Sequence, residues 1–350
     1  MQRSAATISA SLKKVPPFPP VAVKLLSLLS NTAVDTNEVA ELISSDAAFT
    51  ARLLQRVNSA EFAFVSDITN VRRAVELLGL DTTRQITLAH ATTSYAGGGL
   101  KTETMRRCWR HMVATAVLAE EIAAACGVFG GVAFTAGIMH DIGRLGLLVA
   151  YPGEYEEVIR DAAARCLDVL DFEKEEFGAH HAEAGRMLAE RWGLPAEMGL
   201  IAGRHHDPCE GAELDLLRIV HVACQLADVL GYDVVKPLVL LTADDVLAKL
   251  PARARGRLLL TPEQLCERIE QRIQDFSSEP ANASPEETLA FLAIANAAED
   301  PEQFSTVADA EAGPVESGGE QSPLRRHRTI ILWVLTGLAV IASAAIWVWR

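Results

Sequence analysis

The segment Ala136-Gly-Ile-Met-His140-Asp141-Ile-Gly143-Arg144-Leu-Gly146-Leu-Leu148 governs the interpretation of this sequence, because a His-Asp pair interrupts a largely apolar, glycine-rich run. A buried ionisable group costs several kcal/mol unless it is paired or bound to a metal. The pair therefore predicts either a satisfied polar network or a metal site. Gly137, Gly143 and Gly146 recur at roughly helical spacing, and glycines at such positions allow a neighbouring helix or a ligand to approach the backbone closely.

Composition and charge exclude several classes of protein. Of the 350 residues, 49% are hydrophobic and 22% are charged, so the chain can bury one large core or two smaller ones and is not disordered. A formal net charge of −14, without a basic cluster in the body, argues against nucleic acid as a partner. The cysteines are dispersed without a CxxC motif, and the N-terminus has no continuous apolar segment that would indicate a secretory signal. We therefore expect reduced core thiols and a cytosolic main body.

Helical periodicity extends through most of the chain, and strand alternation of useful length is absent. After a tail over residues 1–14, short capped helices fill residues 15–99, which end in a triple glycine. Longer periodic segments fill residues 100–232, and a capping box that begins at Thr261 starts the last of the helices that close the body over residues 233–276. The sequence predicts an all-α body over residues 15–276.

The C-terminal part differs in composition from the body. Residues 277–322 contain acidic residues but no Lys or Arg, which predicts a flexible acidic linker over 277–328, with a short capped helix near 285–298. From Thr329 to Trp349 there is no charged residue, and Arg325, Arg326 and Arg328 precede this span. A helix of that length reaches about 31 Å, enough to cross a hydrocarbon core, and the arginines favour a cytoplasmic N-terminal side. We expect residues 329–349 to form a single-pass C-terminal anchor.

A set of His and Asp residues on or at the ends of separate predicted helices forms the candidate site: His111, His140, Asp141, His181, His205, His206 and Asp228. Imidazole and carboxylate groups suit a divalent transition metal such as Fe, Mn or Zn, as one ion or two. Two ions would acidify a shared water and clamp a phosphoryl oxygen. Taken singly, each position has a structural alternative. His205-His206 could simply end a helix before Pro208, and Asp228 could be a solvated carboxylate.

Six segments of the chain carry a family resemblance: residues 15–23, 46–54 together with 57–60, 139–143, 181–185, 192–195 and 205–208. They resemble the HDOD family, the HD-related output domains of bacterial signalling proteins, and more distantly the HD superfamily of metal-dependent phosphohydrolases. The resemblance covers residues from about 15 to 232 and extends toward 276. It implies an HD-like helical bundle over residues 100–232 packed on the helical N-terminal part over residues 15–99.

Carried over residue by residue, the HD pattern implies one metal held by His111, His140, Asp141 and Asp228. A second metal would be held by His181, His205 and His206, with Asp141 bridging the two ions. If the protein is an enzyme, Asp141 and Arg144 are its candidate catalytic residues. Two departures count against catalysis. The GYP signature of the cyclic-dinucleotide phosphodiesterases of the HD-GYP type is missing, and the lysine often found after His-Asp-Ile-Gly is Arg144 here.

The resemblance implies a regulatory protein rather than an enzyme. We expect a signalling domain tethered to the bacterial inner membrane, with its HDOD part in the cytoplasm, that acts by binding a signalling protein or a small phosphorylated ligand. A metal is expected to hold its bundle together. The alternative is a metal-dependent phosphohydrolase that acts on a nucleotide or a cyclic dinucleotide.

Overall fold

The computed structural model describes residues 12–29, 34–59, 62, 68–96, 100–128, 130–207, 214–258 and 260–277, which belong to one compact unit. These residues form helices and no β-strand, so the predicted all-α body is confirmed for the part of the chain described. The predicted linker beyond residue 277, the short helix near 285–298 and the anchor over 329–349 lie outside the described residues.

The helices follow in chain order as α2 (Pro20–Leu29), α3 (Thr36–Ser44), α4 (Ala47–Val57), α5 (Val71–Tyr95), α6 (Glu103–Cys126), α7 (Gly130–Met139), α8 (Ile142–Ala150), α9 (Pro152–Arg165), α10 (Val169–Phe177), α11 (His181–Trp192), α12 (Ala196–Arg204), α13 (Leu216–Ala227), a π-helical turn (Asp228–Tyr232), α14 (Ala243–Leu247), α15 (Ala252–Arg255) and α16 (Pro262–Ser277).

Local signals in the sequence set several of the helix ends. The Asp46 carboxylate accepts hydrogen bonds from the first amides of α4, and Thr261 and Gln264 form the reciprocal bonds of a capping box at α16. Gly79 interrupts α5 with a φ of 76°, which a residue with a Cβ rarely adopts. This glycine is therefore a kink between two helical halves.

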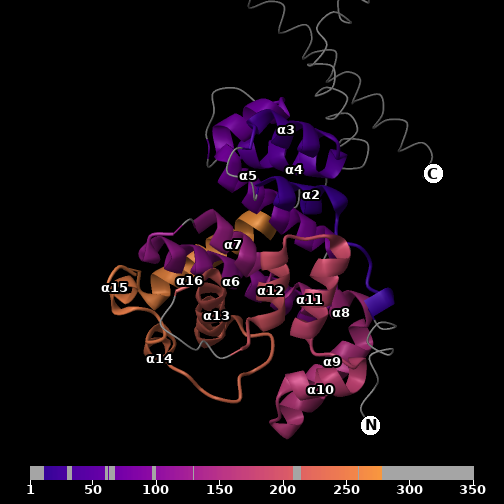
Figure 1. Cartoon of the computed structure of the whole chain (residues 1–350), viewed down its shortest axis with the longest axis vertical. Coiled ribbons are helices and arrows are strands. Elements are labelled where there is room, and N and C mark those ends of the chain that lie inside the picture. The colour runs from indigo at the N-terminus through magenta and orange to yellow at the C-terminus, as the bar shows by residue number, and fades with distance from the viewer. Residues whose placement is uncertain are drawn as a thin grey trace, which may run out of the picture. The chain divides into compact units, whose positions relative to one another are not determined.

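Helices α2 to α5 gather at one end of the described unit, and α6 lies among the helices of the other end (Figure 1). Helix α6 packs against α7, α13 and α16, whereas α11 packs against α8 and α12. The two ends share one continuous apolar core, to which α5 contributes Leu88 and α6 contributes Met112. The predicted N-terminal and HD-like parts are therefore joined by a common core.

The central His-Asp segment is two helices, although the sequence suggests one. Helix α7 ends at Met139 and α8 begins at Ile142, so His140 and Asp141 occupy the break between them. The break turns both side chains toward the same buried site. Among the described residues, Gly131–Ala150 is also the one segment long and apolar enough to cross a membrane, but 89% of its apolar window is buried inside the bundle.

We expect His90, in the N-terminal helices, to make the free energy of unfolding depend on pH under acidic conditions. Its ring packs edge-on against Phe49, and burial followed by the nearby Arg52 charge lowers its pKa from 6.5 to about 4. The unfolded chain therefore binds a proton between pH 6.5 and 4 that the folded protein does not bind, and stability falls as the pH drops through this range. The loss attributable to His90 approaches about 3 kcal/mol.

The measurement is chemical denaturation of the wild type and of His90→Gln at pH 7 and at pH 4. The variant should lose less of its free energy of unfolding on acidification than the wild type does. Equal pH dependence in the two proteins would contradict the assignment to His90.

Candidate metal centre

Close helix packing positions the His-Asp pair. A Cβ at Gly137 would lie 2.5 Å from Cα of Ala116 in α6, and one at Gly143 would lie 2.7 Å from Cα of Gly185 in α11. Both distances are far below van der Waals contact, so only glycine allows these approaches. The glycines singled out in the sequence therefore bring α6 and α11 against the segment that carries His140 and Asp141.

Hydrogen bonds hold three buried imidazoles in the tautomer whose Nε2 atom can bind a metal. Nδ1 of His140 donates to the Gly137 carbonyl at 2.6 Å, and Nδ1 of His111 donates to the Tyr232 carbonyl at 3.1 Å. Nδ1 of His205 donates in the same way to the Ala202 carbonyl at 3.0 Å. With Nδ1 protonated, each Nε2 carries a free lone pair. Burial lowers the pKa of all three rings, to about 3 for His111, which keeps them neutral.

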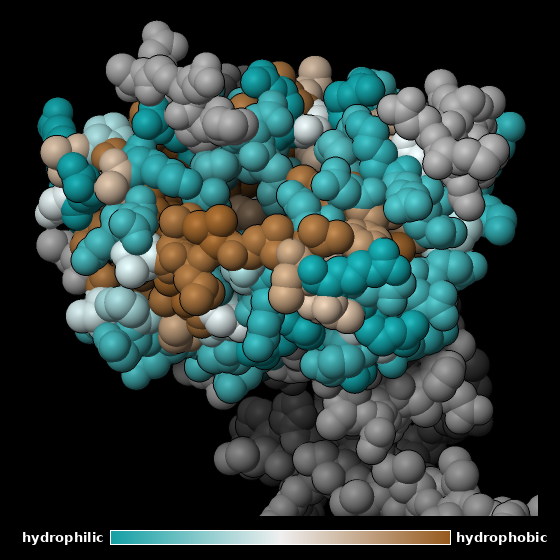
Figure 2. Space-filling model, turned by 90° about the horizontal axis from the view of Figure 1, so that it is seen from below, coloured by the Kyte–Doolittle hydropathy of each residue, from teal (hydrophilic) through white to brown (hydrophobic). Residues whose placement is uncertain are grey.

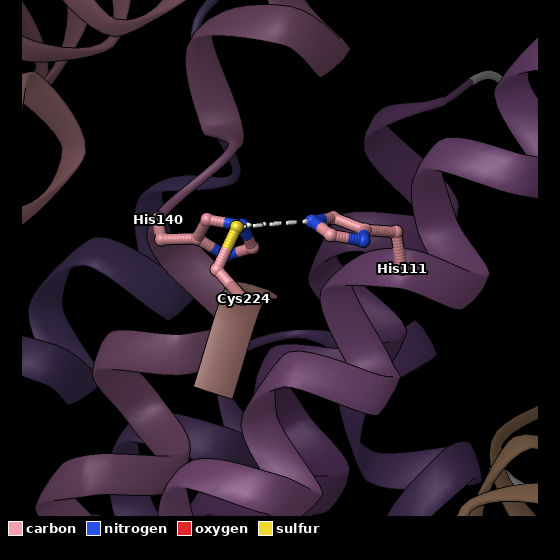
Figure 3. Close-up of side chains that lie close together, drawn as sticks. All are labelled: His111, His140 and Cys224. Atoms are coloured by element: carbon pink, nitrogen blue, oxygen red, sulfur yellow. Dashed lines mark hydrogen bonds between the residues drawn. The ribbon is translucent and has the colours of Figure 1, made fainter. Parts of the chain in front are cut away.

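Two of these lone pairs face one another. Nε2 of His140 lies 3.3 Å from Nε2 of His111, and Sγ of Cys224 lies 3.5 Å from the same His111 atom (Figure 3). Two unprotonated nitrogens cannot form a hydrogen bond with each other, so this contact requires a shared proton or a cation. The three side chains come from α6, α13 and the α7–α8 break.

Two further buried acceptors lie beside His140 without a hydrogen-bond partner: Asp141 Oδ1 and His205 Nε2. The ligand atoms of His140, Asp141 and His205 lie within 4.8 Å of one another. Leaving such acceptors buried and unpaired costs about 1–3 kcal/mol each, and more for a charged group. The donor set and its orphaned atoms therefore fit a bound cation.

Arg144 occupies the other side of Asp141. Its Nε donates to Asp141 Oδ2 at 2.8 Å, and its Nη2 donates to His181 Nε2 at 3.1 Å. Burial raises the pKa of Asp141, but the Arg144 guanidinium outweighs burial and holds that pKa well below its usual range. The guanidinium thus bonds to two of the atoms that a second ion would need.

A second carboxylate, Glu173, completes this buried network. It accepts hydrogen bonds from Nδ1 and from the backbone N–H of His181, each at 2.7 Å, and from the Tyr155 hydroxyl. Arg144 Nη1 lies 3.6 Å from Glu173 Oε1. Burial raises the pKa of Glu173, but His181 and then Arg144 outweigh burial and lower this pKa to about 2. Arg144 therefore lies between two buried carboxylates.

The remaining predicted ligands lie at the edges of this site. His206 Nε2 lies 2.8 Å from His181 Nε2, and these two residues form a third group with His205. Asp228 lies behind His111, with Oδ1 3.4 Å from Nδ1 rather than near Nε2. Burial raises the pKa of Asp228 to about 7. The structure thus gathers six of the predicted residues by their ligand atoms and leaves Asp228 as a partner of His111.

Three residues of the site carry little signal in the sequence. Cys224 stands one helical turn before Asp228 and was expected to be a core thiol, and Glu173 and Tyr155 lie in helices that show only ordinary amphipathic patterns. Only Cys224 lies within one turn of a predicted ligand; Glu173 is eight residues from His181, and Tyr155 is 11 residues from Arg144. Tertiary packing alone brings them to the site.

A cavity of about 670 Å³ opens from the site to the surface. His111, Asp141, His205 and Cys224 line its base. Its mouth is lined by exposed apolar side chains: Leu167, Leu238, Val239 and Leu240. Figure 2 shows apolar surface gathered on this side of the molecule, where the chain between α13 and α14 runs in Figure 1. The cavity therefore combines a polar base with an apolar mouth.

This helical bundle with a buried His-Asp centre defines an HD-like domain. The chain belongs to the HDOD family, whose domain model matches residues 15–208, as the sequence predicts. A relative from Treponema pallidum, itself uncharacterised, is 28% identical over 210 residues. The match covers 58% of this chain and 40% of the relative, so the chain spans less than half of that protein's length.

Solved structures share the fold. An HDOD domain protein of unknown function from Geobacter sulfurreducens is 23% identical and has a TM-score of 0.59, over 77% of this chain and 95% of that one. A protein from Marinobacter aquaeolei described as a candidate for signal transduction has a TM-score of 0.55 at 18% identity, over 83% and 65%. A candidate phosphohydrolase from Shewanella amazonensis has a TM-score of 0.52 at 24% identity, over 79% and 97%. At these identities the likeness concerns the fold alone.

Proposed function

We propose that this protein is a membrane-tethered signalling domain that holds one divalent transition metal ion and binds a small ligand in its cavity. The observation that carries the proposal is that Arg144 occupies the side of the site where a second ion would bind. The free ligand atoms surround His140, whereas Asp141 Oδ2 and His181 Nε2 are bonded to the guanidinium. A guanidinium supplies fixed positive charge in place of a second ion.

The position of Arg144 also favours a regulatory role for the protein over a hydrolytic one. A two-metal phosphohydrolase clamps the attacking and leaving oxygens between two ions, and an aspartate such as Asp141 would bridge them. Here Arg144 bonds to the atoms of Asp141 and His181 that the second ion would use. The alternative activity, a metal-dependent phosphohydrolase, is supported by the opening of the centre into a cavity and is tested below.

The cavity supports a small ligand with an anionic group and an apolar part. A bound ion would supply a Lewis-acidic position for an anionic group such as a phosphate. The exposed Leu238, Val239 and Leu240 at the mouth would contact the apolar part.

Membrane tethering rests on residues 329–349 and the arginines before them. We infer a single-pass anchor in the inner membrane with the HDOD domain in the cytoplasm. Full-length protein should sediment with membranes and require detergent for release, whereas recovery in the soluble fraction without detergent would contradict the anchor.

Metal analysis of the full-length protein, purified in detergent without chelator, tests the proposed centre. We expect about one transition metal ion per chain, and His140→Ala should lower the metal affinity at least about 100-fold because it removes a direct ligand. His90→Ala, a change of the same type in α5, should keep the ion. An absence of metal in the wild type, or two tightly bound ions, would contradict the proposal.

Assays with nucleotides, cyclic dinucleotides and a simple phosphomonoester separate regulation from hydrolysis. The metal-loaded protein should show no turnover. Turnover that disappears in Asp141→Ala would establish the phosphohydrolase instead.

A further inference from the structure

The HD pattern assigns Asp228 to the metal that His111 and His140 would hold, but the structure places a different side chain there. Asp228 lies at the Nδ1 side of His111, next to the Tyr232 carbonyl that accepts the Nδ1 proton. A group on that side orients the ring and cannot share an ion with Nε2. At Nε2, the side chain that faces the ring is Cys224, one turn earlier on the same helical segment.

The spacing of the three donor atoms agrees with tetrahedral coordination. Two histidine nitrogens about 2.0–2.1 Å from a tetrahedral zinc ion are about 3.3–3.4 Å apart, and a nitrogen and a thiolate sulfur about 2.3 Å from it are about 3.5 Å apart. The structure has 3.3 Å between the Nε2 atoms of His111 and His140, and 3.5 Å between His111 Nε2 and Cys224 Sγ. Both distances therefore agree with ligation, and all three donor atoms lie within 4.8 Å of one another (Figure 3).

Burial and access agree with a metal site rather than a chance contact. His111, His140 and Cys224 are 4%, 1% and 4% exposed, so their ligand atoms are screened from solvent. His111 and Cys224 also line the cavity, which leaves a fourth coordination position accessible from it. Three protein ligands with one open position are the arrangement of zinc sites that bind a further ligand.

We propose that Cys224 is a thiolate ligand of the metal centre, and that with His111 and His140 it forms a soft, zinc-selective site. This inference rests on the proposed metal centre and assigns its ion to the thiol side of His140 rather than to the Asp141 and His205 side. Thiolate ligands select zinc over the harder ions manganese and iron(II). The thiol releases its proton when it coordinates.

Cobalt(II) serves as the probe, because it adopts zinc coordination and a cobalt–thiolate bond gives a charge-transfer absorption band in the near ultraviolet. Full-length protein in detergent is stripped with chelator and titrated with cobalt(II). We expect the thiolate band to saturate at one equivalent and to disappear in Cys224→Ala. Cys108→Ala, which removes another fully buried thiol that contacts Met112, should keep the band.

Metal selectivity gives an independent readout. Cys224→Asp replaces a soft ligand with a hard one, so we expect it to retain metal while the ratio of zinc to manganese affinity falls at least tenfold. Circular dichroism before titration identifies a variant that has failed to fold, and the Cys224→Asp protein then supplies the test if Cys224→Ala does not fold.

The outcomes separate the two proposals. One bound cobalt ion without a thiolate band, or a band that survives in Cys224→Ala, would overturn the assignment of Cys224 and leave the ion on the Asp141 and His205 side. An unchanged selectivity ratio in Cys224→Asp would overturn it as well. Failure of the wild type to bind cobalt or zinc at all would overturn the metal centre itself.

Discussion

Gly143→Ala is expected to lower the free energy of unfolding by at least about 3 kcal/mol, the upper part of the range for overpacked interiors. The added Cβ would lie 2.7 Å from Cα of Gly185 and closer still to the His181 carbonyl oxygen and the Gly185 nitrogen. All three atoms are backbone, so no side-chain rotation relieves the overlap. Helices α8 and α11 must separate, which moves Asp141 away from His181.

Gly153→Ala is the matched control. Gly153 is exposed in the first turn of α9, and a Cβ there meets no atom within 4 Å. Reduced flexibility of the unfolded chain should stabilise that variant by about 0.4–1 kcal/mol. Urea denaturation followed by circular dichroism measures both variants. A change of less than about 0.5 kcal/mol for Gly143→Ala would show that α8 and α11 can separate at little cost.

Arg144→Met should also be strongly destabilising, by about 3–5 kcal/mol, because it leaves buried carboxylates without their cation. The side chain of Arg144 is 7% exposed, and its partners Asp141 and Glu173 are 2% and 0% exposed. These carboxylates are therefore only weakly solvated once their cation is lost. Methionine preserves much of the side-chain volume, so the expected loss reports the charge and its hydrogen bonds rather than a cavity.

Two comparisons isolate the buried charge. Arg160→Met removes an arginine of α9 that is 68% exposed and pairs with Glu157, and its effect should stay within about 0.5 kcal/mol. Adding Glu173→Gln to Arg144→Met removes one orphaned carboxylate, so the double variant should lose at least about 1 kcal/mol less than the sum of the single changes. Strict additivity would show that Arg144 and Glu173 do not act as a pair.

The sequence predicts the helices well because their signals are local. Asp46, Gly79 and Thr261 act within one or two turns of their own position, through a cap, a positive φ or a capping box. The break between α7 and α8 has no comparable signal. It arises where His140 and Asp141 turn into the site, and glycine at 143 allows α11 to pack directly against the following helix.

The ligand set illustrates the limit of prediction by motif. The ligands His111, His140-Asp141, His181 and His205-His206 stand at four separate places in the sequence, yet a family resemblance identifies them together because each stands at a recognisable position. The position of a residue in a motif does not predict which neighbouring atoms its side chain will face in the folded protein. Asp228 matches the pattern but lies behind the His111 ring, whereas Cys224, which matches nothing, faces its Nε2.

By itself, the sequence determined the helical class, the family and the residues that supply most of the candidate ligands, since periodicity, caps and motifs are properties of neighbouring residues. Tertiary structure alone decided that Arg144 is bonded to His181, that Glu173 lies beside it, and that Cys224 lies beside the paired histidines. These contacts join residues distant in sequence. The distances between these groups are set only when the helices pack. The chemistry of the His140-Asp141 segment therefore depends on helices elsewhere in the chain.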